Sequence, residues 1–210
     1  MNITVTDCDQ ETLAKFNKFA KTNNFNIVAI NADSFNGEPI DVLVQPKESN
    51  MRTAKVLHTI AHGGSIVTEE WLSIKKNVTD EETLEKYSHP KWKMACKKSM
   101  LAHSTSSAGN VQGIEKQKHN NNNSAPLILT KKKVCLGKGL KMKKNLITSI
   151  IKSLGGEIAE QLSSDIVIVN NDEDVESLES LSKKQYKIMK EKQFFDSVAT
   201  FTPIFDVDNK

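Results

Sequence analysis

The stretch "MRTAKVLHTIAHGGSIVTEEWL" (residues 51–72) decides the fold. Its apolar residues recur at helical spacing over about 53–61, and we expect a Gly-Gly turn, a short strand and a second helix start to follow. These apolar residues suffice to build a core. The stretch nevertheless begins with two cations and a hydroxyl within one helical turn, at Arg52, Thr53 and Lys55. A core does not require these polar residues, which makes them candidates for function.

Expected strands and helices alternate through the first 88 residues. Residues 2–6, for example, alternate and are β-branched, which is typical of a strand. The expected strands lie at 2–6, 25–30, 40–46 and 65–68, and the expected helices at about 10–22, 53–61, 69–76 and 79–87. Thr79 and Glu82 fit a capping box at the start of the last of these helices. Strands that alternate with helices predict an α/β domain whose parallel sheet is covered on both faces.

The sequence changes character between about 97 and 126. This segment is rich in Ser and Asn, has no apolar period and includes four consecutive asparagines. Such a composition predicts a disordered or poorly ordered linker. A structureless stretch of this length would be unusual inside one domain, so it indicates a domain boundary. We therefore expect a first repeat at 1–88, a partly disordered inter-repeat linker at 89–130 and a second repeat at 131–210.

After the linker the order of elements repeats. The expected strands lie at 132–137, 156–162, 164–170 and 186–189, and the expected helices at 143–156, 174–184 and 191–201. Two units of similar order in one chain indicate a divergent internal repeat. The chain has 210 residues, which suffices for two domains of roughly 90 residues that each bury a core.

The composition is ordinary for a soluble protein, with 38% hydrophobic and 26% charged residues and a net charge of +3. No apolar run reaches the length of a membrane helix, the N-terminus lacks the pattern of a secretory signal, and we expect no membrane partner. Cys8, Cys96 and Cys135 match no zinc spacing and no disulfide framework. We expect reduced thiols in an intracellular protein.

Both halves carry motifs of a known family. The segments "TVTDCDQETLAKFNKFAK" (4–21) and "RTAKVLHTIAHGGSIVTEEWL" (52–72) align without a gap with a repeat of the breast-cancer susceptibility protein. The second half matches through "IIKSLGGEI", "SDIVIV" and "FFDSVA", with Gln193 where a tryptophan is usual. The chain thus resembles a tandem pair of BRCT domains, the phosphopeptide-binding modules of DNA-damage-response proteins. The resemblance implies two repeats, each with a four-stranded parallel sheet flanked by about three helices.

The resemblance also implies a phosphate-binding site in the first repeat. Its parts are a hydroxyl at the end of the first strand, matched by Thr6, and the N–H of the next residue, Asp7. The third part is the lysine of a Thr-x-Lys motif, matched by Thr53 and Lys55. Phosphate has three acceptor oxygens and up to two negative charges, which suit such converging donors. Asp7 departs from the family, which usually has glycine there.

A second set of residues matches the part of the family site that binds the peptide beyond the phosphate. Arg52 corresponds to an arginine that contacts the main chain or the terminal carboxylate three residues after the phosphate. Leu57 in the first repeat and Met142 and Lys143 in the second match positions that line the groove between the repeats. A guanidinium suits a carboxylate because it can donate to both oxygens.

Each of these residues also has a simpler interpretation. On spacing alone, Thr6 fits a strand-end residue, and Lys55 and Arg52 fit solvated surface cations. Their joint fit to one motif with ungapped flanks favours phosphate binding. His58 and His62 lie one helical turn apart, as in a metal pair, but no third ligand is evident, and we expect no metal and no cofactor.

The two tryptophans are expected to serve the structure. Trp71 falls on the buried face of a short helix, and we expect it in the core. Trp92 is expected to pack the linker onto the first repeat.

The favoured function is that of a module that binds a phosphoserine or phosphothreonine motif, such as a phosphorylated histone tail, and recruits its host protein to DNA damage or stalled forks. The alternatives are a phosphate-independent scaffold that binds a partner in the groove, and DNA contact through the basic face of the second repeat. That face comprises lysines 131–133, 138, 141, 143 and 144. The sequence contains no catalytic motif, so we do not expect an enzyme.

Several expectations about the host follow from the same features. The polyasparagine tract and the ending "FDVDNK" indicate a C-terminal fragment of a fungal genome-maintenance scaffold. We expect a nuclear protein and a monomer. The second repeat lacks a strand-end hydroxyl followed by a Thr-x-Lys helix, so we expect no second phosphate pocket.

Overall fold

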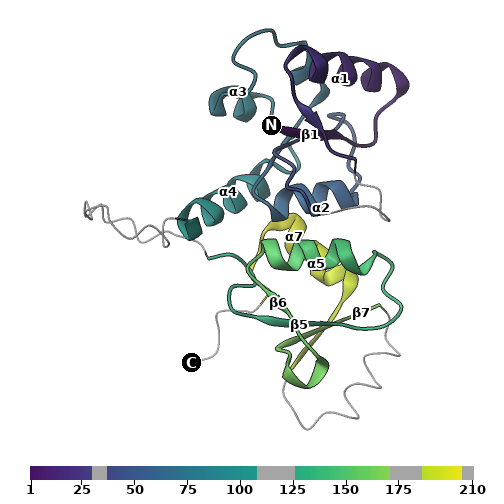
Figure 1. The fold of residues 1–210 in the computed structure, drawn as a ribbon, viewed down its shortest axis with the longest axis vertical. Coiled ribbons are helices and arrows are strands. Elements are labelled where there is room, and N and C mark those ends of the chain that lie inside the picture. Colours follow the sequence, from purple (N-terminus) through teal and green to yellow (C-terminus); the bar gives the residue numbers. More distant parts are fainter. Residues whose placement is uncertain (30–36, 108–125, 171–185, 205–210) are drawn as a thin grey trace, which may run out of the picture.

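The computed structural model describes residues 1–29, 37–107, 126–170 and 186–204. These residues form two α/β units that follow one another along the long axis of the molecule (Figure 1). Each unit contains a four-stranded parallel sheet, and the strand orders are β2-β1-β3-β4 and β6-β5-β7-β8. The predicted class of two α/β repeats with four-stranded parallel sheets is confirmed.

The first repeat follows the expected order of elements. They are β1 (Asn2–Val5), α1 (Gln10–Thr22), β2 (Asn26–Ile27), β3 (Val42–Val44), α2 (Ala54–Ala61), β4 (Ser65–Val67), the 3₁₀ helix η1 (Glu69–Ser73) and α3 (Glu81–Lys86). Side chains cap the two longer helices. Asp9 accepts a hydrogen bond from the Thr12 N–H at 2.7 Å, and Thr53 accepts one from the Val56 N–H at 3.3 Å. These caps satisfy N–H groups that have no acceptor within their helix.

A linker helix, α4 (Lys93–Ser107), separates the first repeat from the second. The elements of the second repeat are β5 (Lys133–Leu136), α5 (Lys144–Ser153), β6 (Glu157–Ile158), the 3₁₀ helix η3 (Gln161–Ser163), β7 (Ile166–Val169), β8 (Lys187–Lys190) and α7 (Glu191–Thr200). The helix expected at 174–184 lies outside the described residues.

The central strands of the two sheets have the same register. In the first repeat the last residue of β1, Val5, lies opposite Val44. In the second repeat the last residue of β5, Leu136, lies opposite Ile168. The residues that follow these strands are therefore equivalent, and both donate their backbone N–H across the sheet at 2.8–3.0 Å.

The structure corrects three local expectations. Residues 97–107 belong to α4, because Ala102 and its apolar neighbours pack on the first repeat; the rest of the expected linker, 108–125, lies outside the described residues. The helix expected at 69–76 is the shorter η1. The capping box of Thr79 and Glu82 is wrong, because α3 starts at Glu81 and its N-cap residue, Asp80, makes no side-chain cap. Boundaries and caps depend on packing that periodicity does not show.

The two repeats are joined through helices. α2 packs against α5 and α7 of the second repeat, and α4 packs against α2 and α7 (Figure 1). Leu57 on α2, Ile147 on α5 and Phe194 on α7 are fully buried in one apolar cluster. This shared cluster fixes the second repeat relative to the N-terminal half of α2, where the predicted site lies.

Both tryptophans are buried as expected. Trp71 is 0% exposed and packs against Phe19 of α1, in a cluster confined to the first repeat. Trp92 is 3% exposed and precedes α4, which confirms that it packs the linker segment onto the first repeat. None of the helices that the structure describes has the length and hydropathy of a membrane span.

Candidate phosphate-binding site

The predicted phosphate ligands meet where β1 ends and α2 begins. Thr6 directly follows β1, and Thr53 is the N-cap of α2. The Thr6 hydroxyl donates to the Thr53 hydroxyl at 3.2 Å. Because the N–H groups and the dipole of α2 also point toward this end, the site combines hydroxyls with the part of a helix that favours anions.

Lys55 lies in the first turn of α2 and reaches back to the same strand. Its ammonium donates to the Val5 carbonyl at 2.7 Å. Burial lowers the pKa of this half-buried ammonium from its usual value. An ammonium has three donors, so two remain for an anion beyond the bond to Val5. The bond to the strand therefore fixes the charge at the mouth of the site.

Asp7 has a left-handed backbone conformation, with φ of 52°. Glycine adopts this conformation without strain, and Asp tolerates it better than most residues. The preference of the family for glycine at this position thus has a backbone reason, and Asp7 satisfies the same turn. The exposed Asp7 carboxylate accepts a hydrogen bond from the Ser49 hydroxyl. Within the described part of the chain, no protein acceptor takes the Asp7 N–H, so it remains available to a ligand.

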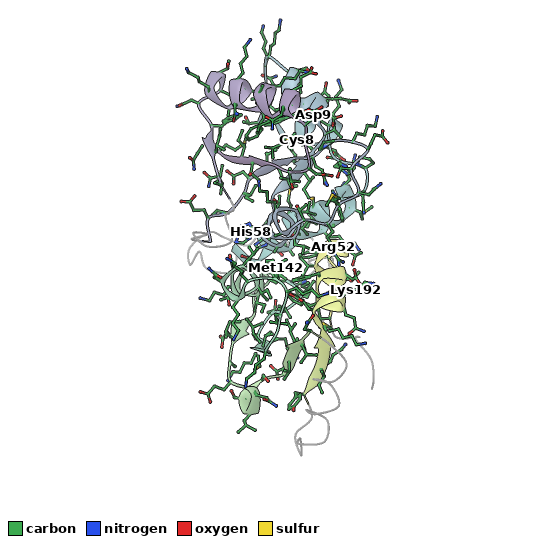
Figure 2. All side chains as sticks on the ribbon, turned by 90° about the vertical axis from the view of Figure 1, so that its right-hand side faces the viewer. Cys8, Asp9, Arg52, His58, Met142 and Lys192 are labelled. Carbon is green, nitrogen blue, oxygen red and sulfur yellow. The ribbon has the colours of Figure 1, made fainter. Side chains whose placement is uncertain are left out.

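Arg52 connects the site to the second repeat. Its guanidinium forms an ion pair with the carboxylate of Asp196 on α7. Figure 2 shows Arg52, His58 and Met142 at the junction of the two repeats, with Arg52 beside the yellow α7. The arginine therefore lies at the junction of the two repeats, and it already has a carboxylate partner.

The remaining predicted groove residues differ in their access to solvent. Leu57 is 1% exposed and belongs to the core that the two repeats share, so it packs inside the junction and does not line a groove. Met142 is half-buried and packs against that core, and Lys143 is exposed at the start of α5. The N–H of Met142 donates at 2.8 Å to the buried carboxylate of Glu191, which also accepts from Lys141 at 3.0 Å. Glu191 thereby fixes this turn beside α7.

The histidine pair of α2 faces the second repeat. The rings of His58 and His62 stack with their centroids 3.9 Å apart, and their Nε2 atoms lie 3.4 and 2.5 Å from the hydroxyls of Ser149 and Ser153 on α5. Burial, and secondarily His62, lowers the pKa of His58 to about 3. Within the described residues, no group of three or more His, Cys, Asp or Glu side chains could hold a metal ion.

The cysteines lie in apolar surroundings. Burial raises the pKa of the Cys96 thiol to about 12, and burial together with Asp9 raises that of Cys8. A raised pKa keeps a thiol protonated and unreactive, and all three cysteines are free thiols, as expected from the sequence.

Three contacts at this site were not predicted from the sequence. Ser49 bonds Asp7, Asp196 pairs with Arg52, and Glu191 fixes the turn before α5. Each joins residues separated by at least 42 positions, and no local pattern marks them.

Comparison with known proteins supports the fold. Residues 124–198 match the family model of the BRCA1 C Terminus (BRCT) domain. Among solved structures, the BRCT5-BRCT6 domains of S. pombe Brc1 are similar, with 15% identity, a TM-score of 0.50 and coverage of 100% of this chain and 96% of that chain. The chain has the fold of a tandem BRCT pair.

A second solved structure supports the same fold. The structure of yeast Rtt107p has 12% identity and a TM-score of 0.52, and the match covers 98% of this chain and 88% of that chain. No curated protein matches the chain. The family model covers the second BRCT repeat, whereas the phosphate-binding residues predicted here lie in the first, whose fold the structural comparisons cover.

Proposed function

We propose that this BRCT pair is a binding module that recognises a phosphoserine or phosphothreonine peptide through its first repeat. The observation that carries the proposal is the convergence of Thr6, Thr53 and Lys55 at one end of β1, with hydroxyls 3.2 Å apart and the lysine bonded to the strand. These residues are up to 49 positions apart in the sequence, and a core would not require any of them. Together they present hydroxyl, ammonium and backbone donors to one anion.

The expected affinity follows from the donors. A charge-assisted hydrogen bond contributes about 1.5–3 kcal/mol. Three of them, less the cost of association, are compatible with a dissociation constant on the order of a micromolar. The negative charge of Asp7 lies close by and weakens the affinity, which raises the dissociation constant, unless the carboxylate stays on Ser49.

Arg52 suggests how the peptide continues. It lies at the junction of the repeats, and a guanidinium binds a terminal carboxylate at two oxygens. We therefore propose a target that ends three residues after the phosphate, such as a phosphorylated histone tail, and recruitment of a nuclear host protein to damaged DNA or stalled forks. The lysines of the second repeat supply a weak additional contact with DNA phosphates.

A second candidate is a scaffold that binds an unphosphorylated partner in the groove between the repeats. Two carboxylates favour it, because Asp7 adds negative charge beside the phosphate site and Asp196 already pairs with Arg52. Both lower the net positive charge that a phosphopeptide would meet.

The first experiment is a fluorescence-anisotropy titration with a labelled phosphoserine peptide that ends in a free carboxylate at the third residue after the phosphate. Unphosphorylated and C-terminally amidated copies serve as matched ligands, and Lys55→Met is compared with Lys15→Met, an exposed lysine on α1. Binding that requires the phosphate and weakens at least tenfold in Lys55→Met alone is the expected result. Equal binding of the phosphorylated and unphosphorylated peptides would favour the scaffold.

A further inference from the structure

A chain of hydrogen bonds links the segment before α4 to the phosphate site. The indole N–H of Trp92 donates to the side-chain oxygen of Gln45 at 2.7 Å, and the Gln45 amide donates to the Ser49 hydroxyl at 2.9 Å. The Ser49 hydroxyl donates to the Asp7 carboxylate. We call these four residues the relay. It crosses from the linker segment through the end of β3 to the turn after β1.

The direction of the relay is fixed by its chemistry. An indole N–H can only donate, so the oxygen of the Gln45 amide must face Trp92. The Gln45 nitrogen also lies 3.0 Å from the Met51 carbonyl, which can only accept. Ser49 therefore accepts from Gln45, and the acceptor that remains for its own proton is the Asp7 carboxylate.

Burial makes this arrangement costly to change. Gln45 is 0% exposed, and its side chain uses both amide hydrogens and its oxygen within the relay and its Met51 branch. A buried polar group that loses its partner costs about 1–3 kcal/mol. Successive donors that point the same way toward a charged acceptor also polarise one another and strengthen the chain.

The relay ends at Asp7, one of the predicted phosphate ligands. Asp7 carries the N–H predicted to bind the phosphate, in a left-handed turn, and its carboxylate is the negative charge that the departure from glycine introduces. While Ser49 holds the carboxylate, Lys55 stays bonded to Val5, and the ion pairs of the described residues include none with Lys55. A released carboxylate could compete with the phosphate for that lysine.

We propose that Trp92, Gln45 and Ser49 are positioning residues of the phosphate site, which hold the Asp7 carboxylate away from Lys55 and fix the turn that presents the Asp7 N–H. The proposal rests on the proposed function. Two neighbouring contacts tie the same loop to the same linker segment: Lys91 donates to the Asn50 carbonyl at 2.6 Å, and His89 lies 3.2 Å from the Pro46 carbonyl. The linker segment thus helps to build a site that it does not line.

The first test compares the two buried tryptophans in the full chain. Trp71 also donates one indole hydrogen bond, to Val78 at 2.9 Å, but it lies outside the relay. Both Trp→Phe changes remove one N–H and keep an aromatic ring. We expect Trp92→Phe to weaken binding of the phosphoserine peptide three- to tenfold, and Trp71→Phe to change it less than twofold. Equal effects of the two changes would overturn the proposal.

The second test is a double-mutant cycle of Ser49→Ala and Asp7→Gly. Ser49→Ala should weaken peptide binding three- to tenfold while Asp7 is present, and less than twofold in the Asp7→Gly chain, because no carboxylate is left to position. If Ser49→Ala weakens peptide binding equally in the wild-type and the Asp7→Gly chains, Ser49 does not act through the Asp7 carboxylate, and the proposal is overturned.

A measurement without peptide separates this proposal from the proposed function. If no folded variant binds the phosphoserine peptide, the proposed function fails, and the relay is judged by the ¹⁵N–¹H signal of Asp7. A displaced signal in Trp92→Phe but not in Trp71→Phe supports the relay. An unmoved signal in both variants overturns it.

Discussion

The two repeats have equivalent sheets but different strand ends. β1 is followed by Thr6 and by Asp7 in a left-handed conformation. At the equivalent end of β5 stand Gly137 and Lys138, and a left-handed residue comes one position later, at Gly139. The scaffold at the two ends is the same, down to the N–H that each donates across the sheet. The chemistry differs, because the second end carries no side-chain hydroxyl.

Packing explains why the end of β5 carries no side-chain hydroxyl. A Cβ added to Gly137 would lie 2.8 Å from the Ile168 carbonyl, closer than real side chains approach. In the first repeat, the Thr6 side chain has room to reach Thr53. The comparison shows that a BRCT sheet does not by itself make a phosphate site. A site requires space at the strand end as well as a helix that supplies the lysine.

The largest effect on stability is expected from placing at the end of β5 the threonine that stands at the end of β1. Gly137→Thr should lower the free energy of unfolding by about 1–3 kcal/mol, because the Ile168 backbone must move to admit the side chain. Urea unfolding measures the change. Gly139→Ser is the matched control, since a Cβ there meets no atom within 4 Å and only its φ of 71° is unfavourable. A Gly137→Thr chain as stable as the control would contradict the packing argument.

The repeats also differ in the faces with which they meet, since α2 contributes two histidines and α5 two serines. His58 has a pKa of about 3 in the folded chain and an ordinary value of 6.5 when unfolded, so below pH 6.5 the unfolded state binds more protons. Stability should therefore fall as the pH drops from 6.5 toward 3, by at most about 1.4 kcal/mol per pH unit from this residue.

Urea midpoints at pH 7.5, 6 and 5 test this dependence. His58→Gln should flatten the loss of stability, whereas Ser149→Ala, which keeps the histidine, should retain it. Equal slopes in the wild type and in His58→Gln would show that another group causes the dependence.

The sequence predicted the scaffold and the parts of the site that lie in one motif. Thr53 and Lys55 belong to one helix start, and Thr6 ends a strand with strong alternation, so local patterns place them. Family resemblance then joins the strand to the helix. Asp196 and Ser49 could not be predicted in this way, because their partners lie 144 and 42 positions away. Such contacts depend on how the repeats and loops pack.

A smaller effect is expected from making the first strand end resemble the second. Thr6→Val keeps the β-branched shape and removes the hydroxyl, so phosphopeptide affinity should fall by about two- to tenfold, the equivalent of one hydrogen bond. The matched control is Thr4→Val. Thr4 is a buried threonine within β1 and is not one of the predicted ligands, so this change should leave affinity unchanged. Anisotropy titration compares them. A similar loss in both variants would indicate an effect on the strand rather than on the site.

The smallest effect on peptide affinity is expected from the ion pair between Arg52 of the first repeat and Asp196 of the second. The Arg52–Asp196 pair is partly solvated, with 27% of the arginine and 55% of the aspartate side chain exposed, and pairs of this kind contribute about 0.2–1 kcal/mol. Asp196→Asn should free the guanidinium and raise affinity for a peptide with a free terminal carboxylate by up to about fivefold. The gain should vanish for the amidated peptide and in an Arg52→Gln chain. An equal gain for both peptides would mean that Asp196 acts through general repulsion, and Arg52 would then not be the carboxylate ligand.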